Sequence, residues 1–100
     1  MRSVPAQRAT LEASPVRVEL WFNERLEPAY SRVSVLDEAK AQVDLRDAAV
    51  ASDDARRLSV SLPPLAPGRY TVEFRVLSLD GHVVESRSTL TVKSWSSRTP

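Results

Sequence analysis

The sequence contains no cysteine, only two glycines, one methionine and one histidine. Without cysteine the chain cannot form a disulfide, a zinc–thiolate site, an iron–sulfur cluster or a cysteine nucleophile. Two isolated glycines cannot make a glycine-rich phosphate-binding loop. The lone histidine, His82, excludes any chemistry that needs two imidazoles from this chain. No serine lies in a nucleophile pattern such as G-x-S-x-G, so we expect that the protein is not an enzyme.

An excess of one charge and long apolar runs are also missing. Fourteen Lys and Arg stand against thirteen Asp and Glu, and the net charge of +1 gives no basis for nucleic-acid binding. No apolar run approaches the roughly 20 residues that span a bilayer, and residues 1–10 lack the apolar core of a secretory signal. We therefore expect one domain over residues 1–100, a monomer, with frayed ends at about 1–5 and 95–100.

Apolar and polar residues alternate along much of the chain, which is typical of strands with one buried face. Runs of this kind cover residues 16–22, 31–37, 58–62, 69–77 and 83–93, with a weaker run at 41–45. Residues 23–30 are polar and contain a proline, which favours a loop with room for one helical turn. Residues 46–57 are rich in alanine and charge without a sustained helical period, so we interpret them as a solvated connection rather than a short helix.

Several short alternating strands without a strong helix predict an all-β fold, an antiparallel β-sandwich or small barrel. The alternation argues against a doubly wound α/β sheet, whose strands are continuously apolar. The residues that share the inward parity form the predicted core: Val18, Leu20, Phe22, Val35, Leu58, Val60, Tyr70, Val72, Phe74, Val76 and Leu90.

Asp80-Gly81-His82 is the one place where a carboxylate and an imidazole lie two residues apart. Both groups are good ligands for first-row metals, and the glycine between them lets the backbone turn both toward one point. Spacing alone favours a plain hairpin turn, whose aspartate bonds its own backbone. Glu24 follows a predicted strand end and, taken alone, is a solvated carboxylate. Because Glu24 and His82 both fall in loops, we predict that they meet Asp80 at one end of the sandwich.

Three segments together carry a resemblance to a known family. PVRVELWFNERLEP at residues 15–28 matches P-x-x-V-x-L-x-F-x-E, and SRVSVLD follows at 31–37. LSVSLPPLAPGRYTVEFRVLSLDGH at 58–82 matches a pattern of P-L-x-x-G-x-Y-x-V-x-W/F-R-V-x-S-x-D-x-H, and LTVK closes it at 90–93. The chain resembles the CopC copper-resistance family of periplasmic copper-binding proteins from residue 3 to about residue 93.

The resemblance implies a Greek-key β-barrel or immunoglobulin-like sandwich with a Cu(II) site of nitrogen and oxygen ligands. Matched position by position, it implies Asp80, His82 and Glu24 as the metal ligands. It also implies a periplasmic protein that binds Cu(II) and delivers it, with an inner-membrane copper transporter as a partner. Cu(II) is high in the divalent affinity order and favours such ligands.

Two departures from the family pattern bear on the metal. Ser3 and Pro5 match the S-x-P of the opening motif, which puts the family's amino-terminal histidine ahead of Met1. One imidazole and two carboxylates then make an incomplete Cu(II) site. The single methionine argues against a Cu(I) site, which prefers thioethers. The alternative hypothesis is therefore an immunoglobulin-like interaction module that has lost a complete metal site.

Overall fold

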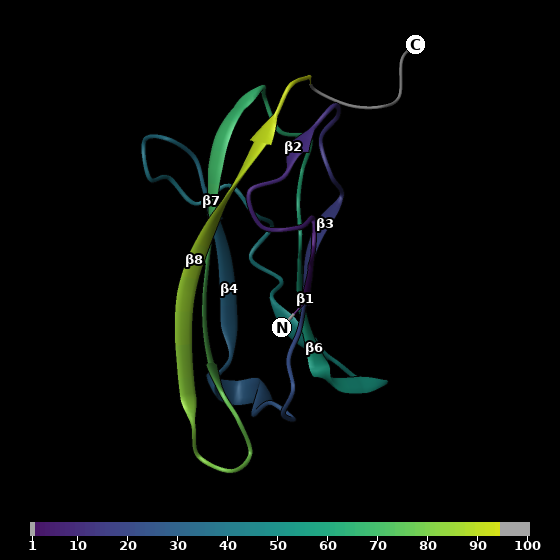
Figure 1. Ribbon diagram of the computed structural model, residues 1–100, viewed down its shortest axis with the longest axis vertical. Coiled ribbons are helices and arrows are strands. Elements are labelled where there is room, and N and C mark those ends of the chain that lie inside the picture. The colour runs from purple at the N-terminus through teal and green to yellow at the C-terminus, as the bar shows by residue number, and fades with distance from the viewer. Residues whose placement is uncertain (1, 95–100) are drawn as a thin grey trace.

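The computed structural model describes residues 2–94, which form two facing four-stranded sheets (Figure 1). One sheet has the order β1-β3-β6-β5 and the other β2-β8-β7-β4. Their strands are β1 (Arg2–Val4), β2 (Thr10–Leu11), β3 (Arg17–Trp21), β4 (Arg32–Leu36), β5 (Ala49–Ala51), β6 (Asp54–Ser61), β7 (Gly68–Leu77) and β8 (Val83–Val92). The predicted all-β sandwich is confirmed.

The core lies between the sheets and consists of the residues that alternate inward. Ten of the eleven predicted core residues are buried, and Phe22 is half-buried. Phe22 packs edge-on against Phe74, with ring centroids 5.3 Å apart, so it closes one end of the core. The core also includes Leu26 and Leu65, which lie outside the strands and are not part of any alternating run.

Residues 46–57, interpreted as a solvated connection, instead contain β5 and the first half of β6. Val50 lies opposite Leu58 in this hairpin, and the register shifts between Val50 and Ala51. Val50 is the single large apolar residue in 46–57, so the segment has no alternation from which a strand could be predicted. The helical turn in residues 23–30 is present as a 3₁₀ helix, η1 (Pro28–Tyr30).

The weak strand predicted at 41–45 does not form as a strand, although Val43 donates its N–H to the carbonyl of Val35 at 2.8 Å. The N–H of Val35 is bound by a side chain instead of by a backbone carbonyl of this segment. The buried carboxylate of Asp44 accepts the N–H of Val35 at 2.8 Å and that of Arg46 at 2.8 Å. Gln42 also donates to this carboxylate, at 3.1 Å. Residues 41–45 therefore contribute an isolated bridge between Leu36 and Gln42 rather than a strand.

At the N-terminal end the structure differs from the prediction of a frayed terminus. Arg2–Val4 are not frayed but pair with β3, and the guanidinium of Arg2 lies 4.3 Å from the centre of the Trp21 ring. β2 pairs with β8 in parallel, an exception to the antiparallel prediction. The expectation for residues 95–100 lies outside the described residues. Over residues 2–94 the fold contains no helix that is long and apolar enough to span a membrane.

Candidate metal site at the β7–β8 turn

The turn between β7 and β8 is held by the side chain of one serine, Ser78. The backbone N–H of Ser78 donates to the carbonyl of His82 at 2.9 Å, and its hydroxyl oxygen accepts the N–H of His82 at 3.1 Å. Gly81 donates its N–H to the Ser78 carbonyl at 3.0 Å and has a φ of +92°, which favours glycine. Asp80 and His82 thus lie on a hydrogen-bonded turn at the end of the β7–β8 hairpin.

Asp80 and His82 contact each other directly. Nδ1 of His82 lies 3.2 Å from Oδ1 of Asp80, and the His82 side chain is 76% exposed. The hydroxyl of Ser78 donates to the same carboxylate oxygen. This hydrogen bond is the largest cause that holds the pKa of Asp80 below its ordinary value of 3.8, and the nearby His82 charge adds to it. The carboxylate stays ionised at neutral pH, as a metal ligand must be.

Glu24 lies in the loop after β3, which is fixed to the same end of the sandwich. The N–H of Leu79 donates to the carbonyl of Arg25 at 2.9 Å, and the N–H of Glu27 donates to the carbonyl of Leu77 at 2.7 Å. Figure 1 shows this loop and the β7–β8 turn together at the lower end of the molecule. These backbone bonds hold the loop of Glu24 beside the turn that carries His82.

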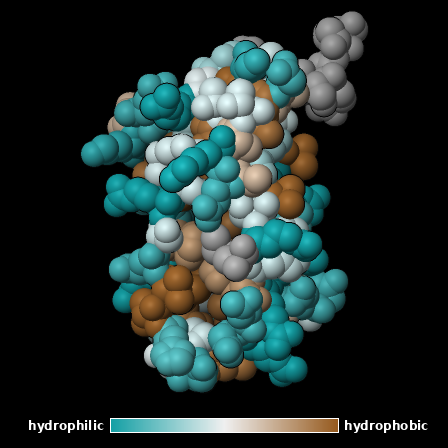
Figure 2. Space-filling view, in the orientation of Figure 1, coloured by the Kyte–Doolittle hydropathy of each residue, from teal (hydrophilic) through white to brown (hydrophobic). Residues whose placement is uncertain are grey.

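A small cavity of about 250 Å³ lies between the loop and the hairpin. Glu24 and His82 line it together with four apolar residues and two neutral polar ones: Phe22, Leu26, Val76 and Val84, and Asn23 and Ser78. Figure 2 shows hydrophobic residues gathered near this end of the molecule.

The structure therefore brings Glu24 and His82 to one cavity, and Asp80 against His82. It does not close the three into a compact cluster: within residues 2–94, no group of three or more His, Cys, Asp or Glu side chains is close enough to hold a metal ion. The donor set of imidazole nitrogen and carboxylate oxygen nevertheless fits Cu(II) and does not fit Cu(I). In this conformation the Asp80–His82 pair is formed and Glu24 stands apart from it.

Sequence reasoning missed two contributors to this site. Ser78 organises the turn, and its signal was present in the S-x-D-x-H pattern at the end of β7, although that serine received no role. The apolar lining from Leu26 and Val84 had no signal, because one lies in a loop and the other near an exposed strand end.

Comparison with known proteins identifies relatives of this chain. Residues 1–93 match the family model of the CopC domain. Protein YobA of Escherichia coli (strain K12) is 32% identical over 90 residues, which are 89% of this chain and 73% of YobA. Copper transport protein CutJ of Bacillus subtilis is 28% identical over 85 residues, which are 84% of this chain and only 16% of CutJ.

Solved structures share the fold. The crystal structure of CopC from Methylosinus trichosporium OB3b has a TM-score of 0.87 and 38% identity, covering 99% of this chain and 96% of that one. PcoC, a methionine-rich copper resistance protein from Escherichia coli, has a TM-score of 0.79 and 26% identity, covering 93% of this chain and 95% of that one.

Proposed function

Because this chain belongs to the CopC domain family, whose solved relatives include copper resistance proteins, we propose that it binds Cu(II) in the periplasm as cargo for delivery. Its ligands are His82, Asp80 and Glu24. The observation that carries the proposal is the pair formed by His82 and Asp80, on a fixed turn beside a cavity that Glu24 also lines. CutJ, in which the matching region is a small part of a copper transport protein, supports a transporter as the recipient.

The residues favour Cu(II) over other ions on chemical grounds. One imidazole and two carboxylates are harder ligands than thiolates, and Cu(II) heads the affinity order for such sites. The ligands leave coordination positions for water or for further donors, as exchange with a partner requires. Binding needs a neutral imidazole, so affinity falls as the pH becomes acidic and histidine is protonated.

Titration of Cu(II) into the wild type and into His82→Ala, Asp80→Asn and Glu24→Gln variants tests the proposal. We expect His82→Ala to abolish most specific binding, because it removes the only imidazole of the chain. The two carboxylate variants weaken binding less. Glu12→Gln is the matched control, since Glu12 is an exposed carboxylate that pairs with Lys93 rather than with the turn. Electron paramagnetic resonance then reports whether nitrogen is lost from the copper coordination.

A second form of the chain, with a histidine placed ahead of Met1, tests the incomplete donor set. It adds a ring nitrogen and an amine nitrogen, and the gain in affinity should be larger at neutral pH than at pH 5, because both must lose a proton to bind. Equal affinity in the proteins with and without this histidine, and with and without His82, would contradict copper binding at this turn. The interaction module would then be the better hypothesis, and the lack of a compact three-ligand group within residues 2–94 favours it.

A further inference from the structure

One edge of the second sheet is open along the first half of β8. β2 lies beside only the far end of β8, where Thr10 and Leu11 face Thr91 and Val92 (Figure 1). The N–H of Arg8 also donates to the carbonyl of Thr89, at 2.8 Å. From Val83 to Ser88, β7 is the only strand that pairs with β8 in the described part of the chain. Residues Val83 to Arg87 are all exposed.

The direction of the backbone groups on this edge follows from the hydrogen bonds at its covered end. The carbonyl of Thr89 accepts from Arg8 and the N–H of Thr91 donates to Ala9, so these residues point their backbone groups away from β7. The register with β7 has no shift between Val83 and Val92. Backbone groups alternate in direction along a strand. Val83, Glu85 and Arg87 therefore also turn their N–H and C=O groups outward, onto an edge that can accept another strand.

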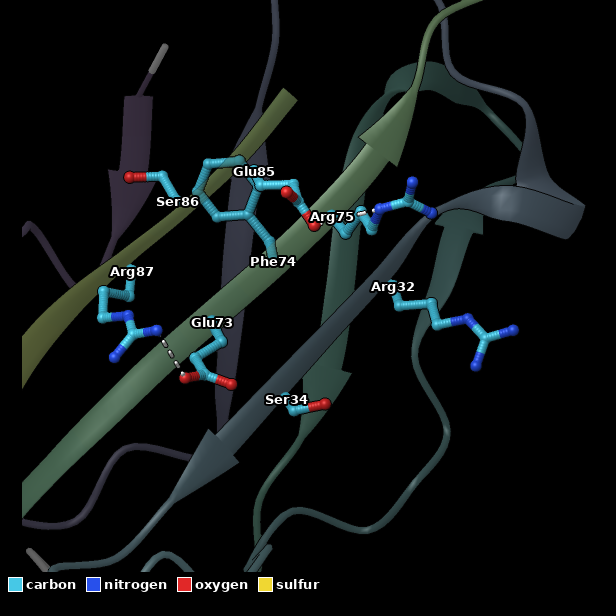
Figure 3. Close-up of a pocket in the computed structure, with 8 residues that line it drawn as sticks. All are labelled: Arg32, Ser34, Glu73, Phe74, Arg75, Glu85, Ser86 and Arg87. Carbon is cyan, nitrogen blue, oxygen red and sulfur yellow. Dashed lines mark ion pairs between the residues drawn. The ribbon is translucent and has the colours of Figure 1, made fainter. Parts of the chain in front are cut away.

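The side chains at two of these positions are charged and lie on the outer face of the sheet. Glu85 pairs with Arg75 at 3.0 Å, and Arg87 pairs with Glu73 at 3.7 Å (Figure 3). The edge therefore presents a negative and a positive side chain two residues apart, next to outward backbone groups.

We propose that this edge of β8 is a self-association surface, which pairs antiparallel with β8 of a second copy of the chain across a two-fold axis at Ser86. Glu85 of each copy then lies opposite Arg87 of the other. A row of alternating charges then crosses the interface. It consists of Arg75 and Glu85 of one copy, followed by Arg87 and Glu73 of the other. The β2-β8-β7-β4 sheets of the two copies thereby form one continuous sheet.

The register is fixed by two conditions. Outward backbone groups belong to residues 83, 85 and 87, so the hydrogen-bonded pairs must join these positions. A register that places Glu85 opposite Glu85, or Arg87 opposite Arg87, sets like charges face to face, which destabilises a sheet. The register with Glu85 opposite Arg87 joins these two positions by hydrogen bonds and forms the opposite-charge pair twice. Val83 then lies opposite Thr89, whose carbonyl accepts from Arg8, so the pairing is confined to Glu85 and Arg87 of the two copies.

The interface is short, because Arg8 occupies the edge from Thr89 onward. It is therefore smaller than the roughly 1,600 Å² that a stable complex usually buries. Association is weak and depends on concentration, and the monomer expected from the sequence is the form at low concentration.

Sedimentation equilibrium from micromolar to millimolar protein, without copper, tests this surface. We expect the wild type to pass from monomer to dimer over this range. Glu85→Lys and Arg87→Glu should each remain monomeric, because each variant sets like charges opposite one another at both pairs. A mixture of the two variants should form a heterodimer, since the two basic side chains of one variant then face the two acidic side chains of the other. A chain with both Glu85→Arg and Arg87→Glu should again form a homodimer.

Arg75→Gln is the matched control. It removes the intramolecular partner of Glu85 but changes neither residue that faces the second copy. It should associate as the wild type does, and circular dichroism checks that every variant is folded. A wild type that stays monomeric at millimolar concentration overturns the proposal. So does a Glu85→Lys variant that associates as strongly as the wild type, or a mixture of the two single variants that forms no heterodimer.

Discussion

Ser78→Ala removes the hydroxyl that organises the β7–β8 turn. The Ser78 side chain is buried, accepts the N–H of His82 at 3.1 Å and donates to the carboxylate of Asp80. Loss of the bond to the His82 backbone should lower the free energy of unfolding by about 1 kcal/mol. Asp80 is solvated, so water replaces the lost donor and we expect no further loss from it. A change of this size lowers the melting temperature by roughly 4–8 °C in a domain of 60–100 residues.

The same variant has a second, more specific effect. The hydrogen bond from Ser78 is the largest cause of the lowered pKa of Asp80, so that pKa should rise toward 3.8 in Ser78→Ala. Carboxyl NMR shifts of Asp80, followed through an acid titration, measure this, and urea denaturation measures the stability. Ser86→Ala is the control, because Ser86 is an exposed serine of β8. An unchanged Asp80 pKa together with unchanged stability would refute the role assigned to Ser78.

Three further predictions concern the sandwich itself. Leu58 is fully buried, so Leu58→Ala should cost about 3 kcal/mol of unfolding free energy in urea denaturation, whereas Leu45→Ala, at an exposed position, should change little. Asp44→Ala leaves a buried backbone N–H of β4 without its acceptor and should cost about 1–3 kcal/mol, most of which Asp44→Asn should recover in the same assay. Asp47 and Asp80 both have a pKa below the ordinary 3.8, through hydrogen bonds from Ser61 and Ser78. Their contribution to stability is complete above pH 3.8 and is lost as the pH falls through the lower folded-state values, so thermal melts in acid should show decreasing stability. A melting temperature that rises on acidification through this range would contradict the assignment.

The alternating runs by themselves determined the sandwich and most of its core. Val18, Leu20, Val60, Val72 and Val76 were assigned inward by parity alone, and all of them are buried. Period-two burial is a local property of each strand, so a linear pattern contains it. The turn at Asp80-Gly81-His82 could also be predicted from local sequence, because Gly81, which adopts a positive φ, directly follows the aspartate.

Only the tertiary structure decided what lies beside that turn. The cavity joins Glu24 to His82 across a long separation in sequence, through backbone bonds such as that from Leu79 to Arg25. The carboxylate of Asp44 accepts the N–H of Val35 in place of a backbone carbonyl from residues 41–45. The alternation of apolar and polar residues contains no sign of this bond. Similarly, the first half of β8 has an open edge because β2 pairs only with Thr91 and Val92. Such features depend on which segments meet in space, and the chain pattern records only which face of each segment is apolar.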